Sequence, residues 1–180
     1  NGFFDNINTG VYLLSCDGNY VYGNILSGNY GSNSVYGTPQ ASDSGVNWWN
    51  TTTYGNLWLD WTGPDTNSDG IVDSPYILTG LGSQDYYPLS FALEITSPAN
   101  GSYVGSPIVG LQGTAISQLD SKLTWRNFIT GGSGTCIGIS AWSAAVPLIE
   151  GENEVEVTLS ILSMYEVNAT ITVVLDSIPP

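Results

Sequence analysis

Hydrophobic and polar residues alternate one by one in the second half of the chain. The clearest run is EVEVTLSI at 154–161, in which every second residue is apolar. Side chains of a strand point alternately to its two faces, so this run predicts a half-buried strand. The side chains expected to face the core are Val155, Val157, Leu159 and Ile161. Comparable runs recur from residue 93 onward at roughly ten-residue spacing, which predicts a β-sandwich over residues 91–180.

The first half has a different texture, because Gly, Asn, Asp and Ser interrupt every apolar run within a few residues. Short strands joined by tight turns are the expected result. Within GVYLLSCDGNYVYGNIL, residues 10–26, we predict strands at 11–15 and 20–25 with Asp17-Gly18-Asn19 as the turn. The segments TGVYLLSCDGN and YGNILSGNYGS each join a Gly-led apolar run to a polar corner, as two coils of one solenoid would. The whole chain is therefore predicted to be all-β.

Residues 10–26 resemble a repeat of the NosD-like proteins, right-handed parallel β-helices of the carbohydrate-binding and sugar-hydrolase type. In such repeats, asparagines at inward corners stack in ladders between successive coils. The resemblance implies that Asn19 and Asn24 occupy such positions.

Residues 47–89 extend the resemblance through five ordered motifs. These are Gly55-Asn56-Leu57-Trp58, Asp60-Trp61, an Asp/Gly loop at 65–73, Asp73-Ser74-Pro75-Tyr76 and Asp85-Tyr86-Tyr87-Pro88-Leu89. The segment is similar to the one that closes β-helices in many surface proteins of methanogenic archaea. The resemblance implies that residues 1–90 are the last coils and the irregular cap of a β-helix.

The end of the chain resembles a third kind of module. LIEGENEVEVTLSI, followed by NATITVVLDSIPP, is similar to the last strands of bacterial and archaeal immunoglobulin-like modules, which occur in tandem on secreted proteins. The implied fold of residues 91–180 is an immunoglobulin-like β-sandwich.

The acidic loop PDTNSDGIVDSPY, residues 64–76, has the spacing of a calcium loop. The ligands expected at positions 1, 3, 5, 7 and 9 are Asp65, Asn67, Asp69, the carbonyl of Ile71 and Asp73. Gly70 stands at position 6, where such a loop turns sharply. Oxygen ligands on alternate residues of a tight loop can converge on one hard cation, so we predict that Ca²⁺ binds here.

Two departures separate this loop from the helix-flanked calcium loops. Tyr76 replaces the bidentate Glu at position 12, and Pro75 forbids the usual exit helix. The missing ligand would come from Asp60, Asp85 or water, and affinity in the extracellular range of roughly 10⁻⁴ to 10⁻³ M is expected. The alternative is a cluster of Asx-turns without metal, in which the carboxylates accept hydrogen bonds from nearby N–H groups.

The charge balance excludes several partners. The chain has 2 basic and 16 acidic residues, no His, and a formal net charge of −14. Lys122 and Arg126 cannot provide the basic footprint that nucleic acid or an anionic membrane requires. The small share of charged residues, 10%, and the high content of Gly, Asn, Ser and Thr suit an extracellular protein. Lacking a signal peptide and an initiating Met, and ending in VVLDSIPP, the chain is expected to be an internal piece of a longer protein.

Few residues could carry chemistry. Without His, Ser-His and Cys-His catalysis is excluded, and so is the copper binding that the NosD name suggests. Paired carboxylates for glycoside hydrolysis could come from Asp5, Asp17, Asp43, Asp60 and Asp85. Because two coils offer little room for such a pair, we predict that the protein is not an enzyme. Cys16 and Cys136 are expected to be two free thiols or one bridge between the halves.

Eight aromatic residues crowd into some forty positions of the first half. They are Trp48, Trp49, Tyr54, Trp58, Trp61, Tyr76, Tyr86 and Tyr87. We expect them to be buried in the cap over the end of the solenoid, and a platform on which sugars stack is the alternative. Asn50, Asn100 and Asn168 begin glycosylation sequons.

Together these features predict an extracellular scaffolding protein of an envelope layer, sheath, filament or adhesive stalk. The alternative is a carbohydrate-binding accessory region of a polysaccharide-active enzyme. The apolar start of the chain, with Phe3 and Phe4, would lie at an open strand edge. Upstream coils or a neighbouring subunit would cover that edge, so self-association or contact with other modules of a longer surface chain is expected.

Overall fold

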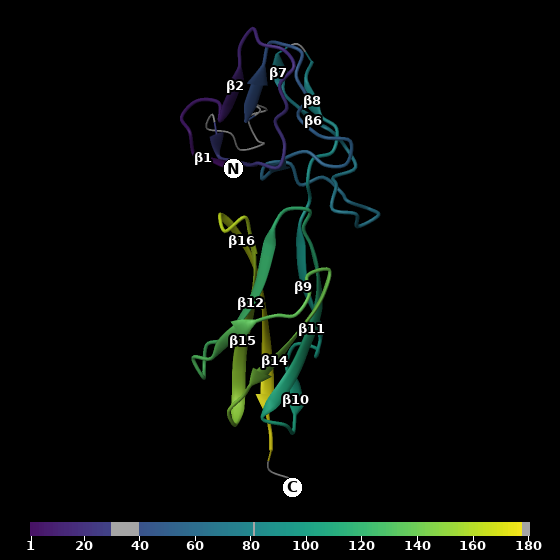
Figure 1. Ribbon diagram of the computed structural model, residues 1–180. Coiled ribbons are helices and arrows are strands. Elements are labelled where there is room, and N and C mark those ends of the chain that lie inside the picture. The colour runs from purple at the N-terminus through teal and green to yellow at the C-terminus, as the bar shows by residue number, and fades with distance from the viewer. Residues whose placement is uncertain (30–39, 81, 178–180) are drawn as a thin grey trace. The chain divides into compact units, whose positions relative to one another are not determined.

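The computed structural model describes residues 1–29, 40–80 and 82–177. Within these ranges the protein is all-β, with sixteen strands and no α-helix, and so no helix that is long and apolar enough to cross a membrane. The chain divides into two compact units, Asn1–Ser90 and Phe91–Pro180 (Figure 1).

The strands of the first unit are only two or three residues long. They are β1 (Gly2–Phe4), β2 (Val11–Leu13), β3 (Ile25–Ser27), β4 (Ala41–Asp43), β5 (Leu57–Trp58), β6 (Tyr76–Ile77), β7 (Thr79–Gly80) and β8 (Gln84–Asp85). Two parallel three-stranded sheets have the orders β1-β3-β5 and β2-β4-β7, and β6 pairs antiparallel with β8. The chain thus passes through three stacked levels, which begin at Asn1, Asn24 and Asn56.

The strand predicted at 20–25 is wrong. Tyr20 makes only an isolated parallel bridge with Trp48, and β3 begins at Ile25. Gly23 lies between them with a φ of 67°, a conformation that turns the chain and that glycine adopts without strain. The first half of the predicted strand therefore pairs with Trp48 of the second level, whereas Ile25 opens that level and pairs with β1 and β5.

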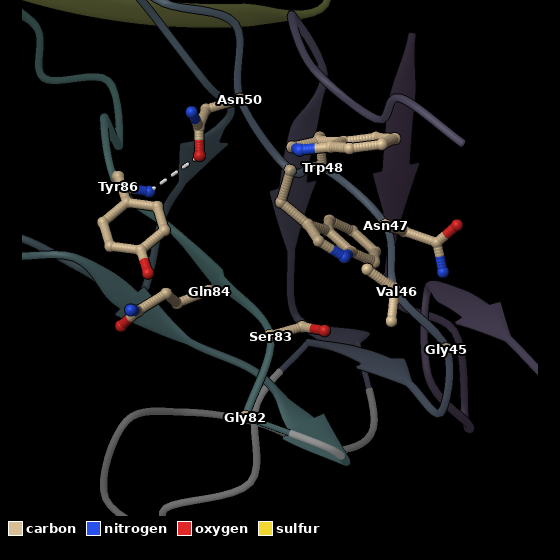
Figure 2. A pocket seen from close by; sticks show the side chains of 10 residues that line it. Gly45, Val46, Asn47, Trp48, Asn50, Gly82, Ser83, Gln84 and Tyr86 are labelled. Atoms are coloured by element: carbon tan, nitrogen blue, oxygen red, sulfur yellow. Dashed lines mark hydrogen bonds between the residues drawn. The ribbon is translucent and has the colours of Figure 1, made fainter. Parts of the chain in front are cut away.

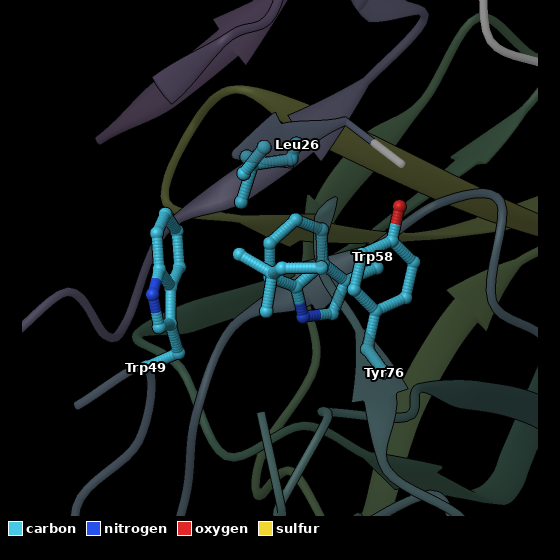
Figure 3. Packing of buried hydrophobic residues seen from close by; sticks show 6 residues of the cluster. Leu26, Trp49, Trp58 and Tyr76 are labelled. Carbon is cyan, nitrogen blue, oxygen red and sulfur yellow. The ribbon is translucent and has the colours of Figure 1, made fainter. Parts of the chain in front are cut away.

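An apolar cluster fills the first unit. Leu26, Ala41, Trp49, Trp58, Tyr76 and Leu78 are buried in it, as Figure 3 shows for most of these side chains. The rings of Trp58 and Tyr76 stack with centroids 3.9 Å apart and planes 7° apart. Phe3, Val11 and Leu13 pack against this cluster from the first level. Aromatic stacking therefore joins segments whose strands are too short to hold together by backbone pairing alone.

Side-chain amides link the levels in two chains of hydrogen bonds, which we call ladder A and ladder B. In ladder A, the Nδ2 of Asn1 donates to the Oδ1 of Asn24 (3.3 Å), Asn24 donates to Asn56 (2.9 Å), and Asn56 donates to Asp85 (3.3 Å). The Oδ1 of Asn56 also accepts the backbone N–H of Asn24. Asn24 therefore stacks between asparagines of the neighbouring levels, as expected.

Ladder B runs through the other corner of the same unit. The Nδ2 of Asn6 donates to the Oδ1 of Asn29 (2.6 Å), and Asn29 donates to the Oε1 of Gln40 (3.0 Å). Gln40 donates in turn to the carboxylate of Asp60. Asn29 and Gln40 are fully buried, so the ladder satisfies polar groups that water does not reach.

The second unit has longer strands in two sheets. The strands are β9 (Ala92–Ser97), β10 (Ser102–Val104), β11 (Ile108–Ile116), β12 (Ser121–Asn127), β13 (Ser133–Thr135), β14 (Ala141–Pro147), β15 (Gly151–Ile161) and β16 (Tyr165–Leu175). One sheet has the order β10-β16-β15-β12-β13 and the other β14-β11-β9. All pairs are antiparallel except β10 with β16.

Burial in the second unit follows the alternation of the sequence. Val155, Val157, Leu159 and Ile161 of β15 are at most 1% exposed, which confirms the predicted core face. On the other sheet, Leu111 of β11 and Val146 of β14 are fully buried. Each sheet thus presents one apolar face to the core.

Candidate functional site

The acidic loop at 65–73 is organised around Asp65. Its Oδ1 accepts the backbone N–H of Asp69 (3.1 Å), and its Oδ2 accepts the N–H of Gly70 (2.9 Å) and the hydroxyl of Ser90 (2.6 Å). Gly70 is buried with a φ of 87°, so the sharp turn predicted at this glycine is present. A residue with a Cβ would be strained there.

The other acidic side chains of the loop also bond to nearby groups. The Oδ1 of Asp69 accepts the N–H of Ile71 (2.9 Å), and the Nδ2 of Asn67 donates to the Oδ2 of Asp69 (2.9 Å). The Oδ2 of Asp73 accepts the backbone N–H (3.1 Å) and the hydroxyl (2.8 Å) of Thr66. These contacts are those of Asx-turns, the alternative considered for the loop.

The donor set of the loop still suits a hard cation. Three carboxylates and one amide oxygen lie within nine residues, and Asn67, Asp69 and Asp73 face solvent. Across the described part of the chain, however, no three Asp, Glu, His or Cys side chains are close enough together to hold a metal ion. Calcium binding would therefore require the side chains of the loop to turn toward one point.

Asp60 and Asp85, the further ligands considered for calcium, have partners of their own. Asp60 accepts hydrogen bonds from Gln40 and from the hydroxyl of Tyr76 (3.2 Å). Asp85 is fully buried and accepts the indole N–H of Trp58 (2.9 Å) and the backbone N–H of Asn56 (2.7 Å). Both carboxylates thus end amide ladders.

The buried carboxylates differ in their electrostatics. Burial raises the pKa of Asp85 to about 6, although hydrogen bonds from Trp58 and Asn56 oppose the shift. Burial acts in the same direction on Asp43, but the pKa of Asp43 lies below its usual value because Trp49, Gly45 and other donors bond to its charged form. The Nε1 of Trp49 lies 2.9 Å from the Oδ2 of Asp43. Of these two buried carboxylates, Asp85 is thus the one whose pKa lies closer to neutral.

The aromatic residues do not share one role. Trp49, Trp58 and Tyr76 are buried, as expected for a cap, whereas Trp48 is 46% exposed and Tyr86 59% exposed. Tyr20 stacks on Trp48 with ring centroids 4.7 Å apart, and both rings face solvent. We call the exposed residues Tyr20, Trp48, Tyr86 and Tyr87 the aromatic patch. The prediction of a wholly buried cap is therefore wrong for Trp48, Tyr86 and Tyr87, whose rings face solvent although the neighbouring Trp49 is buried.

Two hollows of about 310 and 380 Å³ adjoin the aromatic patch. Trp48, Asn50 and Tyr86 line both of them. Figure 2 shows the smaller hollow, in which the side-chain oxygen of Asn50 accepts the backbone N–H of Tyr86 (3.0 Å). Gln84 adds a second amide beside the Tyr86 ring. Aromatic faces beside fixed amides are the features with which proteins bind sugars and other polar ligands.

The sequons lie in three different environments. Asn100 and Asn168 are exposed, and the Oδ1 of Asn100 accepts the N–H of Thr172 (2.8 Å). Asn50 is half-buried, and its Nδ2, the atom that a glycan would modify, donates to the carbonyl of Thr51 (2.6 Å). Asn100 and Asn168 are thus more accessible acceptors than Asn50.

At the start of the chain, β1 and β2 are edge strands of their sheets. Phe3 is half-buried against the core, Phe4 is 39% exposed, and Ile7 is 92% exposed.

The two cysteines, one in each unit, both carry free thiols and are half-buried. Burial raises the pKa of Cys136 to about 11.

No model of a known protein family matches the chain, and no curated protein does. Among solved structures, a crystal structure of an engineered protein is 17% identical, over 49% of this chain and 21% of that chain, with a TM-score of 0.42. A double mutant of a Cellulomonas fimi endo-β-1,4-mannanase is 17% identical over 48% and 18%, with a TM-score of 0.37. A modular endo-β-1,4-mannanase from the same organism is 15% identical over 74% and 31%, with a TM-score of 0.39. The chain spans less than a third of each structure, and these scores are too low to assign a fold or a function.

Two features escaped the sequence analysis. The terminal rungs of the ladders, Asp60 and Asp85, were considered as metal ligands and as candidate catalytic carboxylates, but not as the ends of amide ladders. The stacking of Tyr20 on Trp48 joins residues 28 positions apart in the sequence, and this pair was not predicted. For ladder A, the available signal was the asparagine at positions 1, 24 and 56. The unequal intervals between these positions hide it as a repeat.

Proposed function

We propose that residues 1–90 form the end of a right-handed parallel β-helix of the NosD-like, carbohydrate-binding and sugar-hydrolase type, and that residues 91–180 form an immunoglobulin-like β-sandwich. The stacked parallel strands and ladder A support the first assignment. The two sheets with alternating burial support the second. Residues 91–180 expressed alone should melt cooperatively, and a disordered circular dichroism spectrum would refute this boundary.

The function we propose is extracellular scaffolding, in a module of an archaeal cell-surface chain such as an envelope layer, sheath, filament or adhesive stalk. The observation that carries it is the parallel stack itself, whose edge strands β1 and β2 can each pair with a further strand. A stack that can be extended suits a long surface protein. Exposed sequons at Asn100 and Asn168 agree with a glycosylated surface, and Ca²⁺ at the acidic loop would rigidify the end of the stack.

Surface location can be tested on intact cells that make the protein. Antibodies raised against residues 91–180 should label unfixed cells in immunogold electron microscopy, and a broad-specificity protease should remove the label. Trypsin would be a poor choice, because only Lys122 and Arg126 offer cleavage sites. A cytosolic protein serves as the control. Label that appears only after the cells are opened would contradict the proposal.

Carbohydrate binding is the second candidate, favoured by the solvent-exposed stack of Tyr20 on Trp48 beside two hollows. Sugar rings pack on such aromatic faces through their C–H groups, and Asn50 and Gln84 could bond to hydroxyls. Neutral glycans are the preferred class, because the net charge of −14 repels acidic ones.

Affinity electrophoresis in gels containing neutral polysaccharides tests this candidate. A polysaccharide that binds should retard the protein, and Trp48→Ala should abolish the retardation. Tyr103→Ala is the matched control, because Tyr103 is 75% exposed in the second unit, outside the aromatic patch. Equal mobility of all three proteins across a broad set of neutral glycans would refute this function.

A further inference from the structure

Both amide ladders run in one direction. In ladder A, every bond between rungs runs from an earlier level to a later one, from Asn1 to Asn24 to Asn56. Some rungs also accept the backbone N–H of the preceding rung, as the Oδ1 of Asn56 does from Asn24 and the Oδ1 of Asn29 does from Asn6. A ladder of primary amides can propagate in this way because each amide carries both donors and an acceptor.

The ladders end on carboxylates, which cannot donate a hydrogen bond when they are ionised. Ladder A stops at the carboxylate of Asp85 and ladder B at the carboxylate of Asp60. An ionised carboxylate only accepts hydrogen bonds, so neither ladder can continue past these residues in the same direction. A shorter series follows the same rule, since Asn19 donates to Asn47 (2.8 Å) and Asn47 to Asp43 (2.8 Å).

The opposite end of each ladder lacks a donor. The Oδ1 atoms of Asn1 and Asn6 accept no hydrogen bond from the described residues, and both asparagines are exposed. The backbone of β1 also has unpaired hydrogen-bonding groups on this side. Asn1 and Asp5 bond toward β3, so the alternate residues Gly2 and Phe4 direct their backbone groups to the open side.

We propose that the open edge at β1 and β2 binds a further parallel level that carries asparagine or glutamine side chains above Asn1 and Asn6. Those amides would donate to the two side-chain oxygens, and a strand would pair with Gly2 and Phe4. Phe4 and Ile7, which are exposed, would be covered by the added level. The inference rests on the proposal that the first unit ends a longer stack, and it identifies the side-chain chemistry of the level that would pair with this open edge.

The same polarity argues against head-to-tail stacking of copies of this chain. In such a filament the ladder ends of one copy, Asp60 and Asp85, would face the side-chain oxygens of Asn6 and Asn1 in the next. Carboxylate oxygens would then face amide oxygens, and since both only accept hydrogen bonds, no hydrogen bond could form between them. Asp85 is also fully buried within the first unit, where its carboxylate accepts hydrogen bonds from Trp58 and Asn56. The partner is therefore an amide-bearing level rather than the far end of a second copy.

An extended chain tests the proposal directly. A duplicate of residues 1–23 placed ahead of Asn1 supplies one more level with its own copies of Asn1 and Asn6, since 23 residues separate Asn1 from Asn24. The matched control carries Asn1→Asp and Asn6→Asp in the added copy only. Hydrogen exchange of the backbone N–H groups of the original Gly2 and Phe4 is the measurement. Immunogold labelling of cells is independent of this result, so the two proposals can fail separately.

The amide-bearing extension should slow exchange at Phe4 by about tenfold or more, as expected for hydrogen bonds that must open before exchange. The Asp extension should give a clearly smaller effect. Equal protection by the two extensions, or no protection by the first, would overturn the proposal. Sedimentation velocity of the unextended chain provides a second measurement that does not depend on how the extension folds. It should show no concentration-dependent polymer, and end-to-end filaments would overturn the polarity argument.

Discussion

The two units are both built from strands, yet different interactions hold those strands together. In the second unit, β15 and β16 pair along eleven residues, and apolar side chains fill the space between the sheets. In the first unit, no strand exceeds three residues, and amide ladders and stacked rings connect the levels. Six of the eight buried polar residues in the described chain lie in the first unit. Short strands thus need polar side chains where long strands rely on backbone pairing.

The largest effect is expected from Asn56→Leu, which removes the central rung of ladder A. The Nδ2 of Asn56 donates to the carbonyls of Val21 (2.9 Å) and Trp49 (2.7 Å), and its Oδ1 accepts from Asn24. Because these groups would stay buried without partners, we expect the free energy of unfolding of the first unit to fall by about 4 kcal/mol. Urea unfolding followed by residue-resolved hydrogen exchange measures the loss.

The matched variant in the second unit is Leu159→Ala, which leaves a cavity rather than unpaired polar groups. Leu159 is fully buried, so a loss of about 2–5 kcal/mol is expected there. Each variant should affect its own unit only. If Asn56→Leu left the first unit as stable as before, apolar packing rather than the ladder would hold the levels together.

The next effect is steric. A Cβ on Gly55 would lie 1.9 Å from the Oδ1 of Asp85, so Gly55→Ala must displace a buried carboxylate. We expect a loss of about 3 kcal/mol in thermal unfolding of the first unit. Gly110→Ala is the control, since Gly110 lies in β11 with open space at the Cβ position. That change should be neutral or slightly stabilising, because alanine suits a strand better than glycine. Similar melting of both variants would show that the backbone near Gly55 adapts.

The sequence predicted the second unit better than the first for a physical reason. The alternation at 154–161 reports burial directly, because a long strand exposes each face in turn, and the predicted core face was confirmed. In the first unit, the neighbours Trp48 and Trp49 are 46% and 0% exposed. No regular alternation of apolar and polar residues in the sequence around them predicts this difference in burial. The strand predicted at 20–25 failed because Gly23 turns the chain there. Ladder partners 23 and 32 residues apart leave no local signal.

A moderate effect of pH should distinguish the units. The pKa of Asp85 is about 6 in the folded protein, above the ordinary value of 3.8, so the folded first unit binds a proton that the unfolded chain releases. Its stability should therefore be highest near pH 4 and fall as the pH rises through 6, by about 2 kcal/mol. Thermal melting between pH 4 and 7 measures this dependence. Asp85→Asn should flatten the profile of the first unit, and an unchanged slope would assign the dependence to another group.

The smallest effect concerns calcium. With affinity in the range of extracellular loops, roughly 2 mM Ca²⁺ should stabilise the first unit by about 1 kcal/mol, and chelation should reverse this. Mg²⁺ should do less, because its strict octahedral geometry and tightly held water fit an irregular loop poorly.

Asp69→Asn removes one carboxylate from the loop and should abolish the response to calcium, while Asp120→Asn in the second unit should leave it intact. Without calcium, Asp69→Asn should slightly stabilise the first unit, because three carboxylates within nine residues repel one another. Differential scanning calorimetry with and without chelator measures both changes. If calcium shifts neither protein, the hydrogen bonds that Asp65 and Asp73 accept from Gly70 and Thr66 are sufficient to hold the loop. The difference between the units would then rest on the ladders and the stacked rings alone.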